Sequence, residues 1–515
     1  MPIRITGLAS GLDTERIISA LVSSYSYKTD KYKKAQTKLS WKQDAWKTLN
    51  SKIYSFYKEA GNLKYSSAYS LKTASISDST KASVSVSGNA AAGVQTLEVK
   101  SVAKSEYITG AQMKLADNTS KDKVSTSTTL SQLGYSGSDA SFEVTNKETG
   151  KVSTISVSAD TKVSDFVDQL KEAGLSANFD ATNQRIFIAS SKAGTDNAFD
   201  IKSQNADGDK ALLALGLSMD STVYDSSAEK NSGNSRISAE NATIVLNGAT
   251  YTSSTNDFNI NGVSITALGV TDANSPLTLT VATDTQGIYD KVKSFLSSYN
   301  ALVNEMTSLY NADNAKGYEP LTDDEKDQMS DSEIEKWETK IKDSLLRRDD
   351  TLSGILNSMT NAMSKSYTIN DKSYSLSTFG ISTLGYLNAS KNEQYAYHID
   401  GDEEDSSTSG NEDKLMAAIK NDPDGVVDFM KQLSKGLYDA MDQKMKSSRS
   451  LRSSLTFYND KEMASEYSDY TETITKWEDK LTDMEDFYYK KFSAMETALS
   501  KLQSQTSSLS GLFGS

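Results

Sequence analysis

The apolar positions near the start of the chain repeat with a heptad spacing. They step by three and four, and only two members of the series are charged: Ile18, Leu21, Tyr25, Lys28, Tyr32, Ala35, Leu39, Lys42, Trp46, Leu49, Ile53, Phe56, Ala60 and Leu63. This spacing, sustained over about six repeats, predicts one long helix with an apolar seam. Asp13 or Thr14 is suited to cap its start.

The end of the chain carries a second series of the same kind. Its members are Ile474, Trp477, Leu481, Met484, Tyr488, Phe492, Met495, Leu499, Leu502, Thr506 and Leu509. The step from Tyr488 to Phe492 follows another step of four, which is a stutter that locally unwinds a supercoil without ending the helix. We therefore expect a second long helix at this end.

The two seamed segments differ in charge. Residues 28–58 hold nine Lys and two Asp (9 − 2 = +7), whereas residues 471–486 hold two Lys and six acidic residues (2 − 6 = −4). Exposed ion pairs contribute only about 0–1 kcal/mol each, so charge selects the partner and the seam supplies the energy. We expect the two ends to pair, with two alternatives left open: each end packs on its own domain, or on another copy.

The middle of the chain changes to the alternating pattern of β-strands. Residues 82–86 and 97–103 predict half-buried strands, and residues 128–201 predict an α/β block whose helix, starting near Ser164, stops at Gly174. Asn247-Gly248 and Asn261-Gly262 separate strand-like runs, as in tight hairpins. We expect further strands at residues 244–246, 249–251 and 263–268, and a linker or long loop at residues 219–236.

Helical spacing returns near residue 285. A broad apolar stripe covers residues 288–306, and Thr322–Glu325 and Ser332–Glu335 both have the spacing of a capping box. Asp422-Pro423 marks a further break before residues 426–437. The chain thus leaves a helical region, builds a β excursion and returns to helices.

Together these patterns predict an α+β multidomain fold. It has long coiled-coil-like helices at both ends, a helical leg domain, and two mostly β head domains inserted between the helical halves. The expected domains are residues 1–45 with 460–515 (terminal helices), 46–75 with 285–459 (leg), 76–127 with 237–284 (β head) and 128–236 (outer α/β head).

Composition excludes several classes of function. The 515 residues include no Cys, one His and four Pro, and the net charge is 55 − 69 = −14. The chain therefore has no disulfide, no thiolate metal site and too few imidazoles for a zinc site. An acidic chain is also poorly suited to nucleic acid. We expect no enzyme activity, no catalytic, metal or cofactor site, and no nucleic-acid partner.

His398 and the acidic run Asp400–Asp405 are the remaining candidates for chemistry. His398 has no nucleophile motif to complete a Ser/His/Asp arrangement. The acidic run lacks the twelve-residue spacing of an EF-hand, so a solvated loop is favoured over a Ca²⁺ site. We expect both to be ordinary structural residues.

The sequence also bears on membranes and export. The aromatic residues within the basic 28–58 segment fall on the seam, which favours a solvated or acid-paired face over a membrane or nucleic-acid surface. The longest apolar run, residues 211–215, is far below the ~20 residues that span a bilayer. Residues 1–25 lack the apolar core of a cleaved signal. We expect no membrane insertion, while export that reads an uncleaved N-terminus stays open.

The opening motif resembles that of the flagellar filament cap protein family, also called flagellar hook-associated protein 2. The residues that carry the resemblance are Ile5, Gly7, Leu8, Ser10, Gly11, Leu12, Asp13 and Thr14. Residues 128–202 are similar to the insert of flagellins and hook-associated proteins, residues 257–300 to the family's Asn-Gly hairpin and re-entry helix, and residues 467–505 to its C-terminal helix. These matches cover most of the chain in the family's order; residues 311–350 and 386–415 match least.

The resemblance implies an extracellular protein, exported unfolded and without a cleaved signal, that forms a ring-shaped homo-oligomer at the filament tip. It implies flagellin, an export chaperone and the export apparatus as partners, with folding and insertion of flagellin beneath the cap. Alternatives left open are a hook–filament junction protein or flagellin itself, and a secreted adhesin that binds host mucin or glycans through loop tyrosines. An enzyme is disfavoured.

The seam residues are the expected sites of helix pairing or oligomerisation. These are Ile18, Leu21, Tyr25, Tyr32, Leu39, Trp46, Leu49, Ile53, Phe56, Ile474, Trp477, Leu481, Met484, Tyr488, Phe492, Met495, Leu499 and Leu502. A lone seamed helix leaves its apolar stripe in water, so we expect protease to trim residues 1–45 and 470–515 first. Leu21→Asp combined with Leu39→Asp is expected to abolish ring formation or tip retention while residues 76–284 stay folded.

Overall fold

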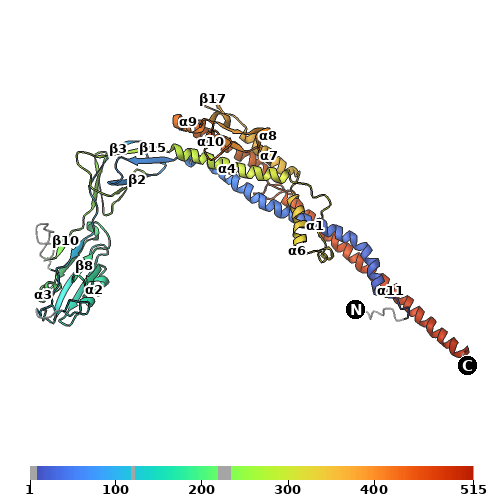
Figure 1. The fold of residues 1–515 in the computed structure, drawn as a ribbon, viewed down its shortest axis with the longest axis horizontal. Helices are drawn as coiled ribbons and strands as arrows, with labels where there is room; N and C mark the ends of the chain where they lie inside the picture. The colour runs from blue at the N-terminus through green and yellow to red at the C-terminus, as the bar shows by residue number, and fades with distance from the viewer. Residues whose placement is uncertain (1–8, 118–121, 218–232, 514–515) are drawn as a thin grey trace. The chain divides into compact units, whose positions relative to one another are not determined.

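The computed structural model describes residues 9–117, 122–217 and 233–513 (Figure 1). It forms two compact units, one of residues Met1–Tyr69 with Thr285–Ser515 and one of residues Ser70–Asp284. The first unit is largely helical and contains both chain ends, and the second is largely β. The predicted fold class is therefore confirmed.

Long helices form the frame of the first unit. They are α1 (Thr14–Leu63), α4 (Thr285–Tyr310), α7 (Asp350–Met363), α10 (Pro423–Lys444) and α11 (Asp460–Phe513). Asp13 caps α1, as predicted, by accepting a hydrogen bond from the backbone N–H of Arg16. α10 begins at the predicted break, with Asp422 as its cap and Pro423 at a position where the missing N–H is harmless.

Aromatic side chains join α1, α4 and α10 in the core of this unit. Phe56 of α1 stacks on Phe295 of α4 with ring centroids 5.7 Å apart, and Tyr57 stacks on Tyr438 of α10 at 4.5 Å. Gly61 allows this approach, because a Cβ atom there would meet the Tyr438 ring at 3.0 Å. The half of α1 nearest residue 63 is thus the centre of a helical bundle.

Short elements complete the first unit. They are η1 (Ser66–Ala68), α5 (Asp323–Lys326), α6 (Asp331–Asp343), β16 (Tyr367–Ile369), β17 (Lys372–Tyr374), η3 (Leu376–Phe379), β18 (Ile381–Thr383), α8 (Gly385–Asn388), β19 (Tyr397–Ile399) and α9 (Lys414–Asn421). The capping box at Thr322 and Glu325 is confirmed. The one predicted at Ser332 and Glu335 is wrong, because α6 starts earlier and its box is formed by Ser330 and Glu333.

The second unit contains an inner pair of antiparallel sheets. One sheet has the order β1-β15-β3-β11-β12 and the other β13-β14-β2. Their strands are β1 (Lys72–Ile76), β2 (Ala82–Val86), β3 (Gly93–Ser101), β11 (Ala242–Leu246), β12 (Ala249–Ser253), β13 (Asp257–Ile260), β14 (Val263–Ala267) and β15 (Leu277–Thr283). Both Asn-Gly pairs form hairpin turns with positive φ at each residue, as the motif predicts.

An outer pair of sheets in the second unit has its own apolar core. The sheets have the orders β10-β4-β8-β7 and β6-β5-β9. The elements are β4 (Tyr107–Thr109), β5 (Ala140–Asn146), β6 (Lys151–Val157), α2 (Val163–Glu172), β7 (Ser176–Asp180), β8 (Arg185–Ala189), η2 (Thr195–Asn197), β9 (Phe199–Ser203), α3 (Ala206–Ala214) and β10 (Ser235–Ile237). Glu106 is buried and bonded to Arg236 and the Phe199 N–H, which ties β10 to β9.

The four expected domains stay a prediction. α1 runs without interruption across residue 45, where the terminal and leg domains were divided. The inner and outer cores of the second unit consist of separate sets of residues. Most of the expected linker at residues 219–236 lies outside the described residues.

Candidate functional site

The paired terminal helices are the candidate site of this protein. α1 and α11 lie side by side and run in opposite directions (Figure 1). Trp46 of α1 stacks on Tyr458 just before α11, and Gln36 donates a hydrogen bond to Thr471 at 2.7 Å. Further along, Lys33 forms an ion pair with Glu478. Successive contacts thus involve lower residue numbers in α1 and higher residue numbers in α11, as expected for an antiparallel pair.

Near the start of the described chain, Glu496 of α11 holds the family-like motif. Its carboxylate accepts a bond from the Ser10 hydroxyl and from the backbone N–H groups of Ala9 at 2.8 Å and Ser10 at 3.2 Å. The Ser10 hydroxyl, followed by the Ala9 N–H, lowers the pKa of Glu496. Gln503 also donates to the Ala9 carbonyl at 3.3 Å. This carboxylate therefore anchors residues 9–10 to α11.

The remaining motif residues lead into α1. Gly11 has a φ of +69°, a conformation that glycine adopts without strain, and Thr14 is buried at the first position of the helix. Leu12 and Asp13 are exposed. Ile5, Gly7 and Leu8 lie outside the described residues.

The α1 seam is buried in its second half. Leu39, Trp46, Leu49, Ile53 and Phe56 are all at most 8% exposed. They pack inside the helical bundle of the first unit, as the stacking of Phe56 on Phe295 illustrates. This half of the seam completes a core within one chain.

The first half of the same seam is covered only in part. Ile18 is buried and Tyr32 half-buried, but Leu21 is 36% and Tyr25 44% exposed. Lys28, which interrupts the apolar series, places its ammonium 4.5 Å from the centre of the Trp477 ring. A cation over an aromatic face is attracted to it, so this lysine contributes to the helix pair.

The α11 seam shows the same gradient. Ile474 is buried, and the following seam residues are half-buried: Trp477, Leu481, Met484, Tyr488, Phe492, Met495 and Leu499. Leu502 and Leu509 are exposed, as is every residue from 500 to 510. The apolar series thus continues beyond the part of α11 that this chain covers.

The charged faces pair differently from the simple expectation. Lys33 bonds to the acidic stretch of α11, but Lys34, Lys42 and Lys52 form ion pairs with acidic residues of the leg: Glu325, Asp349 and Glu305. The expectation that the basic face selects α11 is therefore only partly right. The charge pattern along the sequence does not show which acidic residues lie nearest to each lysine after folding.

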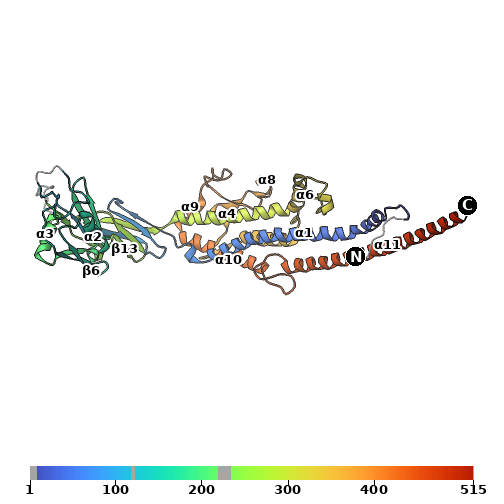
Figure 2. The same cartoon turned by 90° about the horizontal axis from the view of Figure 1, so that it is seen from below.

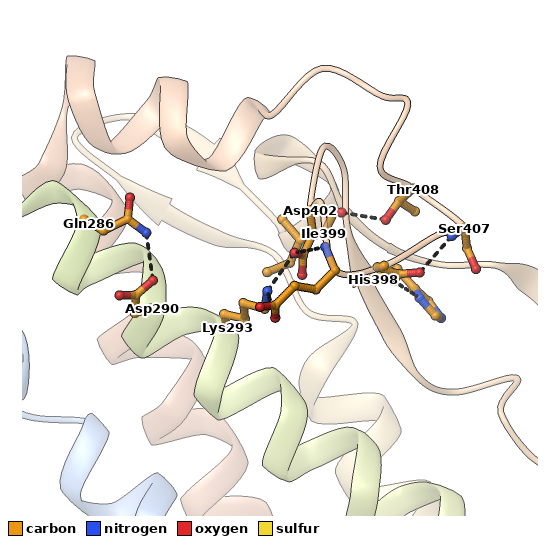
Figure 3. Close-up of polar contacts among 10 residues, drawn as sticks. Gln286, Asp290, Lys293, His398, Ile399, Asp402, Ser407 and Thr408 are labelled. Carbon is orange, nitrogen blue, oxygen red and sulfur yellow. Dashed lines mark hydrogen bonds and ion pairs between the residues drawn. The ribbon is translucent and has the colours of Figure 1, made fainter.

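The acidic loop after β19 is tied to the leg. Asp402 and Glu404 each lie 2.7 Å from the Lys293 ammonium of α4 (Figure 3). The His398 imidazole contacts Asp405 through Nδ1. Burial alone would raise the pKa of Asp405, but the bonds from His398 and the Ser407 N–H lower it. The predicted solvated loop is therefore only partly right, since Glu403 and Glu404 stay exposed while Asp402 and Asp405 fasten the loop to α4 and β19.

Two of these features had no clear signal in the sequence. Glu496 lies between seam positions and looks like an ordinary surface acid, and Lys293 is separated from its partners by more than a hundred residues.

Within the described ranges, no group of three or more acidic or histidine side chains is arranged to hold a metal ion. None of the helices described is both long and apolar enough to cross a bilayer.

Comparison with known protein families decides what this arrangement belongs to. Residues 239–504 match the family described as flagellar hook-associated protein 2 C-terminus, and residues 10–106 match its N-terminal counterpart. The chain belongs to the flagellar hook-associated protein 2 family. The matches support a flagellar filament cap role and do not favour the adhesin or junction-protein alternatives. The family is structural and not a known enzyme family, and it places the chain at the flagellum.

The chain is similar to several individual proteins. Flagellar hook-associated protein 2 of Halalkalibacterium halodurans is 24% identical over 99% of both chains. The A-type protein of Pseudomonas aeruginosa is 29% identical over 59% of this chain and 63% of its own. A crystal structure of the flagellar cap protein FliD D1-D2-D3 domains from Escherichia coli has 22% identity and a TM-score of 0.46, covering 77% of this chain and 95% of that chain.

Proposed function

We propose that this chain forms a ring-shaped homo-oligomer at the filament tip, where it promotes the folding and insertion of exported flagellin. In this proposal the distal seam, meaning residues 12–32 of the chain start with residues 477–510 of α11, contacts other copies or the filament. The chain reaches the tip unfolded through the export apparatus with a chaperone. The absence of Cys is compatible with this route, since no disulfide can block threading.

The observation that carries the proposal is the change in burial along one continuous seam. Leu49 is 1% exposed, whereas Leu502 on the partner helix is 57% exposed, although both occupy apolar seam positions. Exposed apolar side chains that repeat along one helix face gain free energy only when another surface covers them. The distal seam therefore fits a partner outside the chain.

The half-buried contacts suit a cap that must hold the tip and release it as each subunit is added. Residues 477–499 of the seam keep part of their apolar surface in water. Such a contact is weaker than a buried core and can break and re-form without unfolding the leg. The buried half of the seam stays intact through this cycle.

The experiment that tests the function is deletion of the gene followed by complementation. We expect the deletion strain to have bare hooks and to release flagellin into the medium, and the full chain to restore filaments. Tyr25→Asp with Leu502→Asp should fail to restore them, while Ser19→Asp, a change at an exposed polar position of α1, should succeed. Normal filaments in the deletion strain would overturn the proposal.

This pair replaces the combination of Leu21 and Leu39 that the seam pattern suggests. Leu39 is 8% exposed and packs within the leg, so an Asp there would unfold the first unit and obscure an effect on assembly. Tyr25 and Leu502 are exposed in the single chain. Their substitution changes the outer surface of the helix pair and leaves the core of the leg in place.

A further inference from the structure

Two oppositely charged surfaces lie on different sides of the helical leg. The acidic lobe, residues 392–413, holds eight Asp and Glu and no Lys or Arg. The basic loop, residues 444–459, holds four Lys and Arg and no Asp or Glu. Net charges of 0 − 8 = −8 and 4 − 0 = +4 within segments this short favour contact between the two kinds of surface.

The acidic lobe is fixed to the outer side of α4. Lys293 bonds to Asp402 and Glu404, and Asn300 exchanges two hydrogen bonds with the backbone of Tyr397 at 2.7 and 2.8 Å. Even with the charge of Lys293 included, the lobe keeps a net charge of −8 + 1 = −7. Its acidic surface is therefore not neutralised within the chain.

The basic loop is fixed to α1 instead. Asn50 accepts a bond from the Phe457 N–H at 2.7 Å and donates to the Leu455 carbonyl at 3.5 Å. α1 and α4 pack against each other through Phe56 and Phe295, and Figure 2 shows the α10–α11 connection and α8 on opposite sides of this pair. The two charged surfaces consequently face away from each other and do not meet within one chain.

Exposed groups on both surfaces are available for a contact. Glu403 and Glu412 of the lobe and Lys446 and Arg449 of the loop are exposed. None of these four side chains forms an ion pair with another residue in the described part of the chain. The charges that a docking partner would meet are thus free to pair with it.

Each charged surface also carries apolar side chains. Leu455 is 54% exposed and has a φ of +63°, which is unusual for a residue with a branched side chain, and Asn50 holds its carbonyl. On the lobe side, Tyr386 and Leu387 of α8 are 85% and 93% exposed. Tyr386 lines an open cleft of 460 Å³ together with Tyr299, Tyr395 and Tyr397 and with six polar or small residues. One surface thus presents an exposed leucine, and the other presents a depression with tyrosine side chains in its walls.

We propose that the basic loop of one copy docks on the acidic lobe of the next, with Leu455 entering the tyrosine-lined cleft. Two different surfaces on opposite sides of a subunit make a heterologous contact, and a repeated heterologous contact closes a ring when the rotation between copies allows it. This inference rests on the proposed function, because it assigns the contact by which leg domains of a ring meet. The occupant of each surface is a second copy of this chain.

Charge reversal in the full chain tests this contact. Glu403→Lys with Glu412→Lys reduces the net charge of the lobe from −8 to −8 + 4 = −4, and Lys446→Glu with Arg449→Glu reduces that of the loop from +4 to 4 − 4 = 0. We expect either pair of changes to weaken self-association about tenfold to a hundredfold, measured by sedimentation velocity and mass photometry. The matched controls Asp313→Lys with Glu335→Lys, and Lys316→Glu with Lys336→Glu, change the net charge equally at exposed sites and should assemble as the wild type does.

Mixing the two reversed proteins gives the decisive arm. In the mixture the new lysines on the lobe of one protein can face the new glutamates on the loop of the other, so the mixture should assemble more tightly than either protein does alone. Recovery in the mixture also shows that both variants are folded. If the mixture stays dissociated, or if both charge-changed proteins assemble as well as the wild type, the proposed contact between lobe and loop is wrong. That result would leave the proposed ring at the filament tip untouched.

Leu455→Gly tests the apolar part without harming the fold. Glycine adopts a φ of +63° without strain, so the thermal stability of the single chain should be unchanged or raised while self-association falls. Undiminished association of this variant would overturn the assignment of Leu455 to the cleft. A wild-type chain that stays monomeric at every concentration and fails to cap filaments would overturn both this contact and the proposed function.

Discussion

The two halves of the seam should respond differently to the same substitution. Leu49 lies in the buried half on α1 and is 1% exposed, whereas Leu502 lies in the distal half on α11 and is 57% exposed. Leu→Ala has the same small effect on intrinsic helix propensity at both positions. Any large difference between the two variants therefore measures packing within a single chain.

The expected magnitudes follow from burial. Truncating a fully buried leucine to alanine costs about 2–5 kcal/mol, because the transfer energy of the removed groups is lost and a cavity remains. For Leu49→Ala we take about 3 kcal/mol, which lowers Tm by roughly 5 °C in a unit of about 300 residues. Leu502 leaves no closed cavity and keeps most of its surface in water, so its truncation should cost less than about 0.5 kcal/mol.

Tryptophan fluorescence is a suitable assay because it reports on one unit only. All four tryptophans, Trp41, Trp46, Trp337 and Trp477, belong to the first unit, so urea or thermal unfolding followed in this way excludes the β unit. The measurement is made on dilute protein, in which the single chain prevails. Equal destabilisation by Leu49→Ala and Leu502→Ala would show that the distal seam completes a self-contained core, and would refute the reasoning.

Three further predictions concern particular contacts. Gly436→Ala should destabilise the first unit by about 1–3 kcal/mol, because its Cβ would meet the buried Tyr367 hydroxyl, although alanine normally favours a helix. Adding Tyr367→Phe should restore the stability measured by tryptophan fluorescence. A single variant more stable than the wild type would contradict this. Glu106→Ala should destabilise the second unit by about 1–3 kcal/mol, because Arg236 loses its main ion partner and keeps only the Phe199 carbonyl and Asp200, which lies 4.0 Å away. The loss is followed by far-UV circular dichroism, and adding Arg236→Met should recover part of it. Because the pKa of Asp405 is lowered in the folded chain, its stabilising effect is present above the unfolded pKa of about 4 and is lost as pH falls through the folded pKa. The stability of Asp405→Asn should therefore fall less than that of the wild type below about pH 4. Identical profiles of stability against pH would exclude this role.

Periodicity was sufficient to predict the elements of this fold, because burial at every third and fourth or every second residue is a local property. The heptad series predicted α1 and α11, and Asn247-Gly248 and Asn261-Gly262 predicted two hairpins. The capping box of α6 was placed two residues late, since Ser332 and Glu335 have the same spacing as the pair that forms it. Local spacing alone does not separate such neighbouring candidates.

The hydrophobic pattern does not predict contacts between segments that are distant in the sequence. The seam is equally apolar at Leu21 and Leu49, yet the leg covers one and leaves the other partly in water. Glu496 and Lys293 find their partners only after the helices have packed, and no motif marks a carboxylate or an ammonium for such a role. The length of the leg decides which seam residues are buried within the chain and which stay exposed for a partner. That length is a property of the tertiary structure.

Hydrogen exchange of backbone amides, followed by mass spectrometry, tests the central claim most directly. The full chain is compared as a dilute single chain and as an assembled oligomer. The account predicts that residues 39–63 are protected in both states, and that residues 12–32 and 477–510 gain strong protection only in the oligomer. Equal protection of the distal seam in both states would contradict the claim that this part of the sequence is built to be covered by other chains.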